Sequence, residues 1–251
     1  APHARGRLDL YRPEAPARGT RPLIVFFHGG GWQGGEKEEY RFVAQPLCGL
    51  GCEVAVPNYR LFPEARWPAF VEDGAAAVTF LRRDATDGAG PVFLMGHSAG
   101  AFIALSVALD PRWLEGAGMP GGRGALGGAI GLAGPYDFAP EEPAYRAIFS
   151  TAPGGRARVA PAEAARLAGA PPLLLLHGTA DRMVSAERSR DLAALARMAG
   201  VEARVVEYPG VGHIGIIAAL AAPLRVLGLA PAPVLHDVRA FVRRGVGGYS
   251  G

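Results

Sequence analysis

The 251-residue sequence predicts an α/β fold in which a mostly parallel central sheet is covered by helices on both faces. Three observations support this prediction. Short apolar runs alternate with longer amphipathic segments along the chain, as strands alternate with helices in such folds. With 49% apolar and 20% charged residues, the chain can bury a large core. Its 36 glycines and 22 prolines are scattered between the apolar runs, which is typical of many tight turns.

The predicted elements follow one another in a regular order. An apolar run rich in branched and aromatic residues, such as 23–27, is typical of a buried strand. A segment with apolar residues at helical spacing, such as 69–83, is typical of a surface helix. The expected strands are 23–27, 53–57, 92–95, 129–133, 172–176 and 201–207, and the expected helices are 36–50, 69–83, 99–109, 185–198 and 234–243. No internal repeat or linker interrupts them, so we expect residues 1–251 to form one domain.

Two stretches break the alternation of strands and helices. Residues 134–170 are rich in proline, glycine, alanine and arginine, and residues 208–231 combine a histidine loop with an apolar segment. Both stretches follow predicted strands, so they should lie at the carboxyl edge of the sheet, where open α/β folds bind ligands. We expect them to form the walls of a pocket.

Charge and hydropathy exclude some classes of partner. The formal net charge is +3, and no basic stripe with interleaved aromatic residues is present, so we expect no nucleic-acid partner. The purely apolar stretches are far shorter than the roughly 20 residues that span a bilayer, so we expect no membrane span. Cys48 and Cys52 form no disulfide framework, and we expect two small buried thiols. The compartment stays open: the cytoplasm is slightly favoured, but the chain begins at Ala1, which is compatible with a removed export signal.

The sequence predicts no cofactor and no metal. Residues 122–127 fit the pattern G-x-G-x-x-G, but they precede a strand, whereas a dinucleotide site follows one and opens a helix. No pair of histidines stands at metal-ligand spacing, and neither cysteine has a plausible set of partner ligands.

The segment GHSAG at residues 96–100 carries the clearest chemical signal. It lies between the predicted strand 92–95 and the predicted helix 99–109, which is the context of a nucleophile elbow. In such a turn, tiny residues are needed two positions before and after the serine. The turn then presents the hydroxyl of Ser98 at the N-terminus of a helix, as a nucleophile requires.

A second signal is the segment HGGGW at residues 28–32, directly after the strand 23–27. Three glycines allow backbone N–H groups to approach a small anion closely. A tetrahedral intermediate needs two or three such donors. We expect the N–H groups of Gly30, Gly31 and Ala99 to form an oxyanion hole.

With GHSAG, HGGGW and the segment NYRLFPE at residues 58–64, the sequence resembles the α/β-hydrolases, on the esterase side of that fold. It is similar to the hormone-sensitive-lipase-like esterases, and GHSAG in place of their more usual GDSAG leans toward the bacterial carboxylesterase and kynurenine-formamidase-like branch. The resemblance runs from about residue 8 to residue 242. It implies an α/β-hydrolase fold and a catalytic triad in the chain order serine, acid, histidine.

Two residues fit the remaining places of that triad. Asp181 lies in the loop after the strand 172–176, and His213 lies in a glycine-containing loop after the strand 201–207. In this mechanism His213 takes the serine proton and Asp181 holds the tautomer of the imidazole. Asp137 is a weaker candidate for the acid. Of the six histidines, His213 alone has both the loop and the order; the others are His3, His28, His97, His177 and His236.

The resemblance implies a serine esterase, and two departures from the family, a short N-terminal segment and a short stretch 134–170, favour short-acyl carboxylic esters as its substrates. Many relatives carry an N-terminal cap of helices, but the first core strand here begins at residue 23, so we expect a minimal cap or none and a fairly open pocket. Trp32, His97 and Ile214 are the candidate pocket residues. An arylformamidase acting on N-formylkynurenine, an acetyl-carbohydrate esterase and a non-catalytic ligand-binding relative are the alternatives. A homodimer also stays open.

Overall fold

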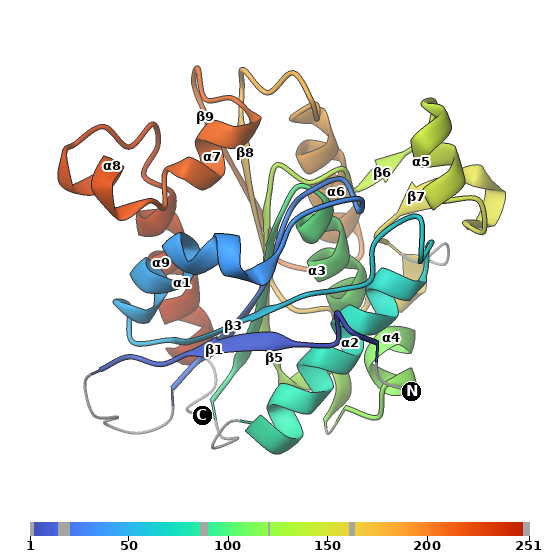
Figure 1. Ribbon diagram of the computed structural model, residues 1–251, viewed down its shortest axis with the longest axis horizontal. Coiled ribbons are helices and arrows are strands. Elements are labelled where there is room, and N and C mark those ends of the chain that lie inside the picture. Colours follow the sequence, from blue (N-terminus) through green and yellow to red (C-terminus); the bar gives the residue numbers. More distant parts are fainter. Residues whose placement is uncertain (1–2, 15–20, 86–89, 120, 161–163, 248–251) are drawn as a thin grey trace.

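The computed structural model describes residues 3–14, 21–85, 90–119, 121–160 and 164–247. Within them a seven-stranded sheet has the order β1-β3-β2-β4-β5-β8-β9, and a two-stranded sheet joins β6 to β7 (Figure 1). In the large sheet only β1, at one edge, runs antiparallel to its neighbour. The strands are β1 Leu8–Tyr11, β2 Leu23–Phe27, β3 Glu53–Pro57, β4 Val92–His97, β5 Leu126–Leu132, β6 Asp137–Phe138, β7 Ala157–Arg158, β8 Leu173–Gly178 and β9 Ala203–Tyr208.

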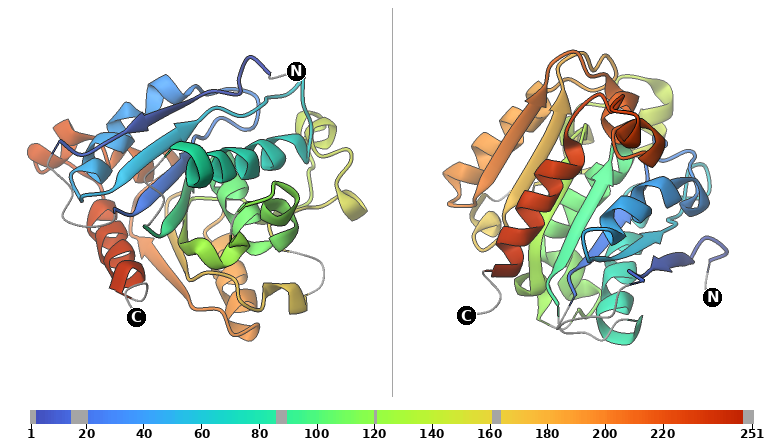
Figure 2. Two further views of the ribbon diagram at one scale, coloured as in Figure 1. Left: turned by 90° about the horizontal axis from the view of Figure 1, so that it is seen from below. Right: turned by 90° about the vertical axis from the view of Figure 1, so that its left-hand side faces the viewer.

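Helices cover both faces of the sheet because successive strand residues point to opposite sides. Helices lie on both faces of the sheet (Figure 2). In β2, Val25 and Phe27 belong to the core shared with α2, α3 and α4, whereas Ile24 and Phe26 belong to the core shared with α1, α7 and α9. The α-helices of the described residues are α1 Arg41–Cys48, α2 Ala69–Phe80, α3 Ala99–Leu109, α4 Pro111–Gly116, α5 Pro143–Ile148, α6 Glu187–Met198, α7 His213–Ala218, α8 Ala222–Val226 and α9 Val234–Gly247. Every residue of α3 is buried, so this central helix is fixed tightly in place.

The register of the parallel strands brings their carboxyl ends to one edge. Phe27 at the end of β2 pairs with Gly96 in β4, and Gly96 pairs with Gly131 in β5. His177 in β8 pairs with Glu207 in β9. The turns that leave β2, β4, β8 and β9 therefore meet at this edge, which is where α/β sheets build their sites.

The sequence pattern predicts the central elements better than the peripheral ones. The bounds of β2, β3 and α3 are those expected, and the α/β fold is confirmed. The expected helix 36–50 instead divides into a 3₁₀ turn, Lys37–Tyr40, and α1. Part of the expected loop 208–231 is helical, since it contains α7 and α8. The edge strand β1 is not predicted, because a half-buried run of four residues has too little periodicity.

None of the helices in the described part of the chain has both the length and the apolar character that crossing a bilayer requires.

The two cysteines are free thiols, Cys48 half-buried at the end of α1 and Cys52 buried just before β3. Burial raises the pKa of Cys48 to about 11 and that of Cys52 to about 12, so the reactive thiolate is scarce at neutral pH. We expect iodoacetamide to label both far more slowly in the native chain than in urea, as measured by mass spectrometry. Equal labelling rates in the folded and unfolded chain would contradict this prediction.

Candidate active site

Ser98 lies in a strained turn between β4 and α3. Its backbone has φ 53° and ψ −120°, a left-handed conformation that non-glycine residues rarely adopt. A Cβ atom on Gly96 would lie 2.2 Å from the carbonyl oxygen of Gly100, and one on Gly100 would lie 2.0 Å from that of Phe27. Only glycine fits at these two positions. The packing thus explains why a serine with two flanking glycines forms this turn.

His213 and Asp181 meet at the same edge of the sheet. Helix α7 packs beside β8 (Figure 1). His213 is the first residue of α7, and its Nδ1 lies 2.7 Å from Oδ2 of Asp181. The loop that carries Asp181 is bonded to the loop before α7, since the N–H of Ala180 donates to the carbonyl of Val211 at 3.0 Å. The Asp181 side chain is fully buried and the imidazole of His213 nearly so. The pair is therefore held on two interlocked loops.

The environment of Asp181 favours its charged form. Burial by itself would raise the pKa of Asp181, but hydrogen bonds from the N–H of Val184 and from His213 outweigh it and hold that pKa below its ordinary value. Oδ1 accepts from the N–H groups of Met183 and Val184, each at 2.9 Å. Oδ2 is left to accept from Nδ1–H of His213. A buried carboxylate so arranged fixes the tautomer of the histidine and stabilises an imidazolium.

His97, expected as a pocket residue, is instead buried between the serine turn and His213. Its side chain is 3% exposed, its ring centroid lies 4.9 Å from that of His213, and its Nε2 lies 3.0 Å from the carbonyl oxygen of His213. A carbonyl only accepts, so Nε2 carries the proton and donates. His97 directly precedes Ser98, so this hydrogen bond links the serine turn to the backbone of His213. A contact of His97 with substrate stays a prediction, and the structure shows a buried ring that packs against His213.

The buried histidines predict how stability depends on pH. Burial lowers the pKa of His28 and of His97 from an ordinary 6.5 to about 4. Between these pH values the unfolded chain binds more protons than the folded chain, so the free energy of unfolding falls as the pH decreases from 6.5 to about 4. We expect a smaller fall for His97→Gln, measured by urea unfolding. His236→Gln, at an exposed site on α9, is the control; an unchanged fall for His97→Gln would contradict the prediction.

The glycine segment after β2 passes directly against the serine turn. A Cβ atom on Gly29 would lie 3.0 Å from Nδ1 of His97 and 3.6 Å from Cβ of Ser98. Gly30 and Gly31 have φ of 120° and 59°, conformations that glycine adopts at little cost. Among the hydrogen bonds of the described residues, none uses the N–H of Gly30, Gly31 or Ala99. The role of these three N–H groups as oxyanion donors stays a prediction.

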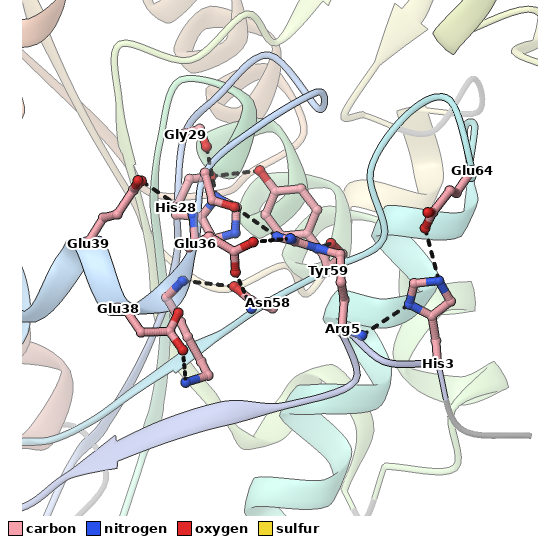
Figure 3. A network of polar contacts seen from close by, with 12 residues as sticks. His3, Arg5, His28, Gly29, Glu36, Glu38, Glu39, Asn58, Tyr59 and Glu64 are labelled. Atoms are coloured by element: carbon pink, nitrogen blue, oxygen red, sulfur yellow. Dashed lines mark hydrogen bonds and ion pairs between the residues drawn. The ribbon is translucent and has the colours of Figure 1, made fainter.

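A network of hydrogen bonds and ion pairs holds the glycine segment 28–32 in place (Figure 3). The guanidinium of Arg5 donates to the carbonyls of Tyr59 and Gly35, each at 2.8 Å, and to the carboxylate of Glu36 at 2.6 Å. The hydroxyl of Tyr59 donates to the carbonyl of His28 at 2.9 Å, and the two rings stack with centroids 4.3 Å apart. The segment is thus anchored at both ends. Arg5 is not predictable from the sequence, since its partners lie 30 or more positions away.

Trp32, also expected as a pocket residue, is a core residue. It is 2% exposed, and its ring packs against those of Phe149, Phe102 and Phe138 at centroid distances of 4.8, 5.5 and 6.1 Å. Phe138 and Phe149 belong to the stretch 134–170, which folds over the tryptophan. A place for Trp32 in the pocket wall stays a prediction, and the sequence does not reveal that this stretch covers its ring.

The remaining candidate residues are Ile214, Asp137 and His3. Ile214 follows His213 directly and is 62% exposed, so it stays a predicted pocket residue. Asp137, the weaker candidate for the acid, is paired with Arg156 at 2.9 Å and Arg158 at 3.5 Å in the small sheet. His3 is exposed and contacts Glu64. A residue whose role the sequence pattern does not reveal is His177, which is buried beside Asp181.

A cavity of about 920 Å³ lies elsewhere, between β1, the start of the chain and α2. Two of the cations that line it are already paired, Lys37 with Asp9 and Arg60 with Asp73, each at 2.7 Å. None of the predicted site residues lines this cavity, so we place the candidate site at the Ser98 edge instead. Among the described residues, no group of three or more histidine, cysteine or acidic side chains could hold a metal ion.

Comparison with known proteins shows which sequences and structures this chain is similar to. The model of a family with the α/β-hydrolase fold matches residues 24–122. A probable isoprenylcysteine alpha-carbonyl methylesterase of Oryza sativa subsp. japonica is 30% identical over 241 residues, which cover 88% of this chain and 58% of that protein. A kynurenine formamidase of Danio rerio is 32% identical over 134 residues, which cover 53% of this chain and 43% of that protein. The chain spans about half the length of the curated relatives it matches.

A solved structure has the same fold. The propionate-bound thermophilic esterase of Thermogutta terrifontis superposes with a TM-score of 0.74 at 24% identity, over 94% of this chain and 88% of that one. The sheet order, the serine turn between β4 and α3 and the family match agree with this likeness. This chain therefore has the α/β-hydrolase fold, and its sequence is similar to those of a methylesterase and a formamidase.

Proposed function

We propose that the chain is a serine hydrolase that cleaves carboxylic esters through an acyl-enzyme on Ser98. The observation that carries the proposal is the 2.7 Å hydrogen bond between His213 and the buried carboxylate of Asp181, at the sheet edge where Ser98 follows β4. His213 accepts the hydroxyl proton through Nε2 as Oγ of Ser98 attacks the ester carbonyl. The same proton then passes to the departing alcohol, and water hydrolyses the acyl-enzyme by the reverse roles.

The negative charge that develops on the carbonyl oxygen needs preorganised donors. The N–H groups of Gly30, Gly31 and Ala99 are proposed for this role, because their segments adjoin Ser98 and these donors are not used within the described residues. Their position at the start of a fully buried helix and on an anchored glycine segment supports a rigid hole. A rigid hole costs no reorganisation as charge develops.

The packing around the glycine segment favours small acyl groups. The hydroxyl of Tyr145 lies 3.4 Å from where a Cβ of Gly31 would stand, beside a proposed oxyanion donor. A long acyl chain that passes this donor would have to displace the ring of Tyr145. We therefore propose short-acyl esters as substrates, with Ile214 at the rim. The rice relative, named as a methylesterase, supports an ester substrate but not its acyl length, because the methyl group of a methyl ester is its alcohol part.

An aryl formamide is the second candidate substrate. The formamidase of Danio rerio supports it, and a formyl group is the smallest acyl group that the site could take. An acetyl ester of a carbohydrate fits the same chemistry.

Rates with four substrates test the substrate class. We expect kcat/KM for p-nitrophenyl acetate and butyrate to exceed that for p-nitrophenyl decanoate. N-formylkynurenine, assayed in parallel, decides between ester and formamide. Faster cleavage of decanoate would overturn the short-acyl proposal.

A further inference from the structure

A second imidazole lies against Asp181. His177, near the end of β8, is completely buried, and its Nε2 lies 3.3 Å from Oδ2 of Asp181. The same nitrogen lies 3.0 Å from the carbonyl oxygen of Val184, and Nδ1 lies 2.8 Å from the hydroxyl of Ser189. The mechanism proposed above makes no use of this histidine. Nε2 thus contacts the turn that contains Asp181 and Val184, whereas Nδ1 contacts Ser189 in α6.

The partners determine the tautomer of His177. The carbonyl of Val184 only accepts, so Nε2 carries the proton. Nδ1 then accepts from the hydroxyl of Ser189. Burial lowers the pKa of His177, which keeps the ring neutral at neutral pH. The ring therefore offers one N–H, and this N–H faces the turn 181–184.

That turn also holds the carboxylate. The N–H of Val184 donates to Oδ1 of Asp181, while the carbonyl of Val184 accepts from His177. The position of Val184 is thus fixed from one side by the acid and from the other by the imidazole. Oδ2 of Asp181 lies between two rings, 2.7 Å from His213 and 3.3 Å from His177. A shift of His177 would move the turn and with it the oxygen that binds His213.

We propose that His177 is a positioning residue whose Nε2–H holds the Asp181 turn so that Oδ2 meets Nδ1 of His213. This inference rests on the proposed function of Ser98, His213 and Asp181. It predicts that losing the Nε2–H slows the chemical step and leaves ester binding intact, because His177 itself does not contact the substrate.

Two variants of His177 separate its nitrogens. The amide nitrogen of His177→Gln reaches the place of Nε2 and keeps the donor toward the turn. The amide of His177→Asn reaches only the place of Nδ1 and keeps the partner of Ser189. We expect His177→Asn to lower kcat for p-nitrophenyl acetate about 10²-fold with little change in KM, as a misplaced catalytic group does. His177→Gln should restore most of kcat.

A destabilising variant remote from Ser98 shows whether lower stability alone reduces kcat. Asp110→Ala removes the N-cap of α4, at the end of α3 remote from Ser98, where Asp110 accepts from the N–H of Arg112. It should lower the melting temperature and leave kcat unchanged. ¹⁵N-histidine NMR of the wild-type chain gives a test that no variant's folding affects: His177 must be neutral with its proton on Nε2.

The outcomes are distinct. Equal kcat in His177→Asn and His177→Gln, a loss carried by KM, or a proton on Nδ1 would overturn the role of His177. If the wild type cleaves no ester, or Ser98→Ala is as active as wild type, the proposed function itself fails.

Discussion

Ser98→Ala is expected to lower kcat for p-nitrophenyl acetate by about 10⁴- to 10⁶-fold, the loss seen when a triad nucleophile is removed. The proposed acyl-enzyme forms on Oγ, and alanine has no atom to replace it. Residual turnover should come from the oxyanion donors and from substrate binding alone. KM should change little, since the hydroxyl contributes mainly to the transition state. Steady-state kinetics on the purified variant give both constants.

Ser106→Ala is the matched control for this variant. Ser106 lies in α3, the helix that Ser98 begins, and its buried hydroxyl has no hydrogen-bond partner among the described residues. The substitution removes the same atom from the same helix, so activity should stay at the wild-type level. Comparable losses in both variants would mean that helix packing, and not the nucleophile, explains the effect.

Asp181→Asn should lower kcat by about 10⁴-fold, because an amide changes the hydrogen bond to His213. The NH₂ group of asparagine can donate to Nδ1 and thereby hold the proton on Nε2. In that tautomer Nε2 cannot accept the proton of Ser98. The backbone should stay unchanged, since asparagine also accepts from Met183 and Val184. Circular dichroism verifies the fold, and kinetics at several pH values measure the loss.

Asp137→Asn tests the alternative acid. Asp137 follows a core strand, as Asp181 does, but it is half-exposed and paired with two arginines. We expect this variant to keep wild-type kcat. A large loss in Asp137→Asn, with activity retained in Asp181→Asn, would reverse the assignment of the acid.

The strands and the chain order of the predicted triad follow from local patterns. Buried parallel strands are continuous apolar runs, and glycine is required at positions 96 and 100 by contacts within the turn and with β2. Such requirements can be recognised in a sequence. The helix α7 was harder to predict, because Ile214–Ala219 is almost wholly apolar and has no amphipathic period.

Roles that depend on distant contacts could not be predicted. His97 and the carbonyl that it binds are 116 positions apart, and Arg5 binds a carbonyl 54 positions away. The packing of Phe138 and Phe149 on Trp32 could likewise not be predicted, because these residues are far from it in the sequence. His177 stands four positions before Asp181, a spacing visible in the sequence, but only the fold turns its ring toward the acid.

Covalent labelling of Ser98 by a fluorophosphonate tests the central proposal most directly. An activated serine attacks phosphorus and expels fluoride, so the folded wild type should gain one phosphonyl group, and peptide mass spectrometry should locate it on Ser98. Ser98→Ala and urea-unfolded wild type should gain none. A folded wild-type chain that stays unlabelled, or carries the adduct on another serine, would contradict the assignment and favour a non-catalytic ligand-binding member of the superfamily.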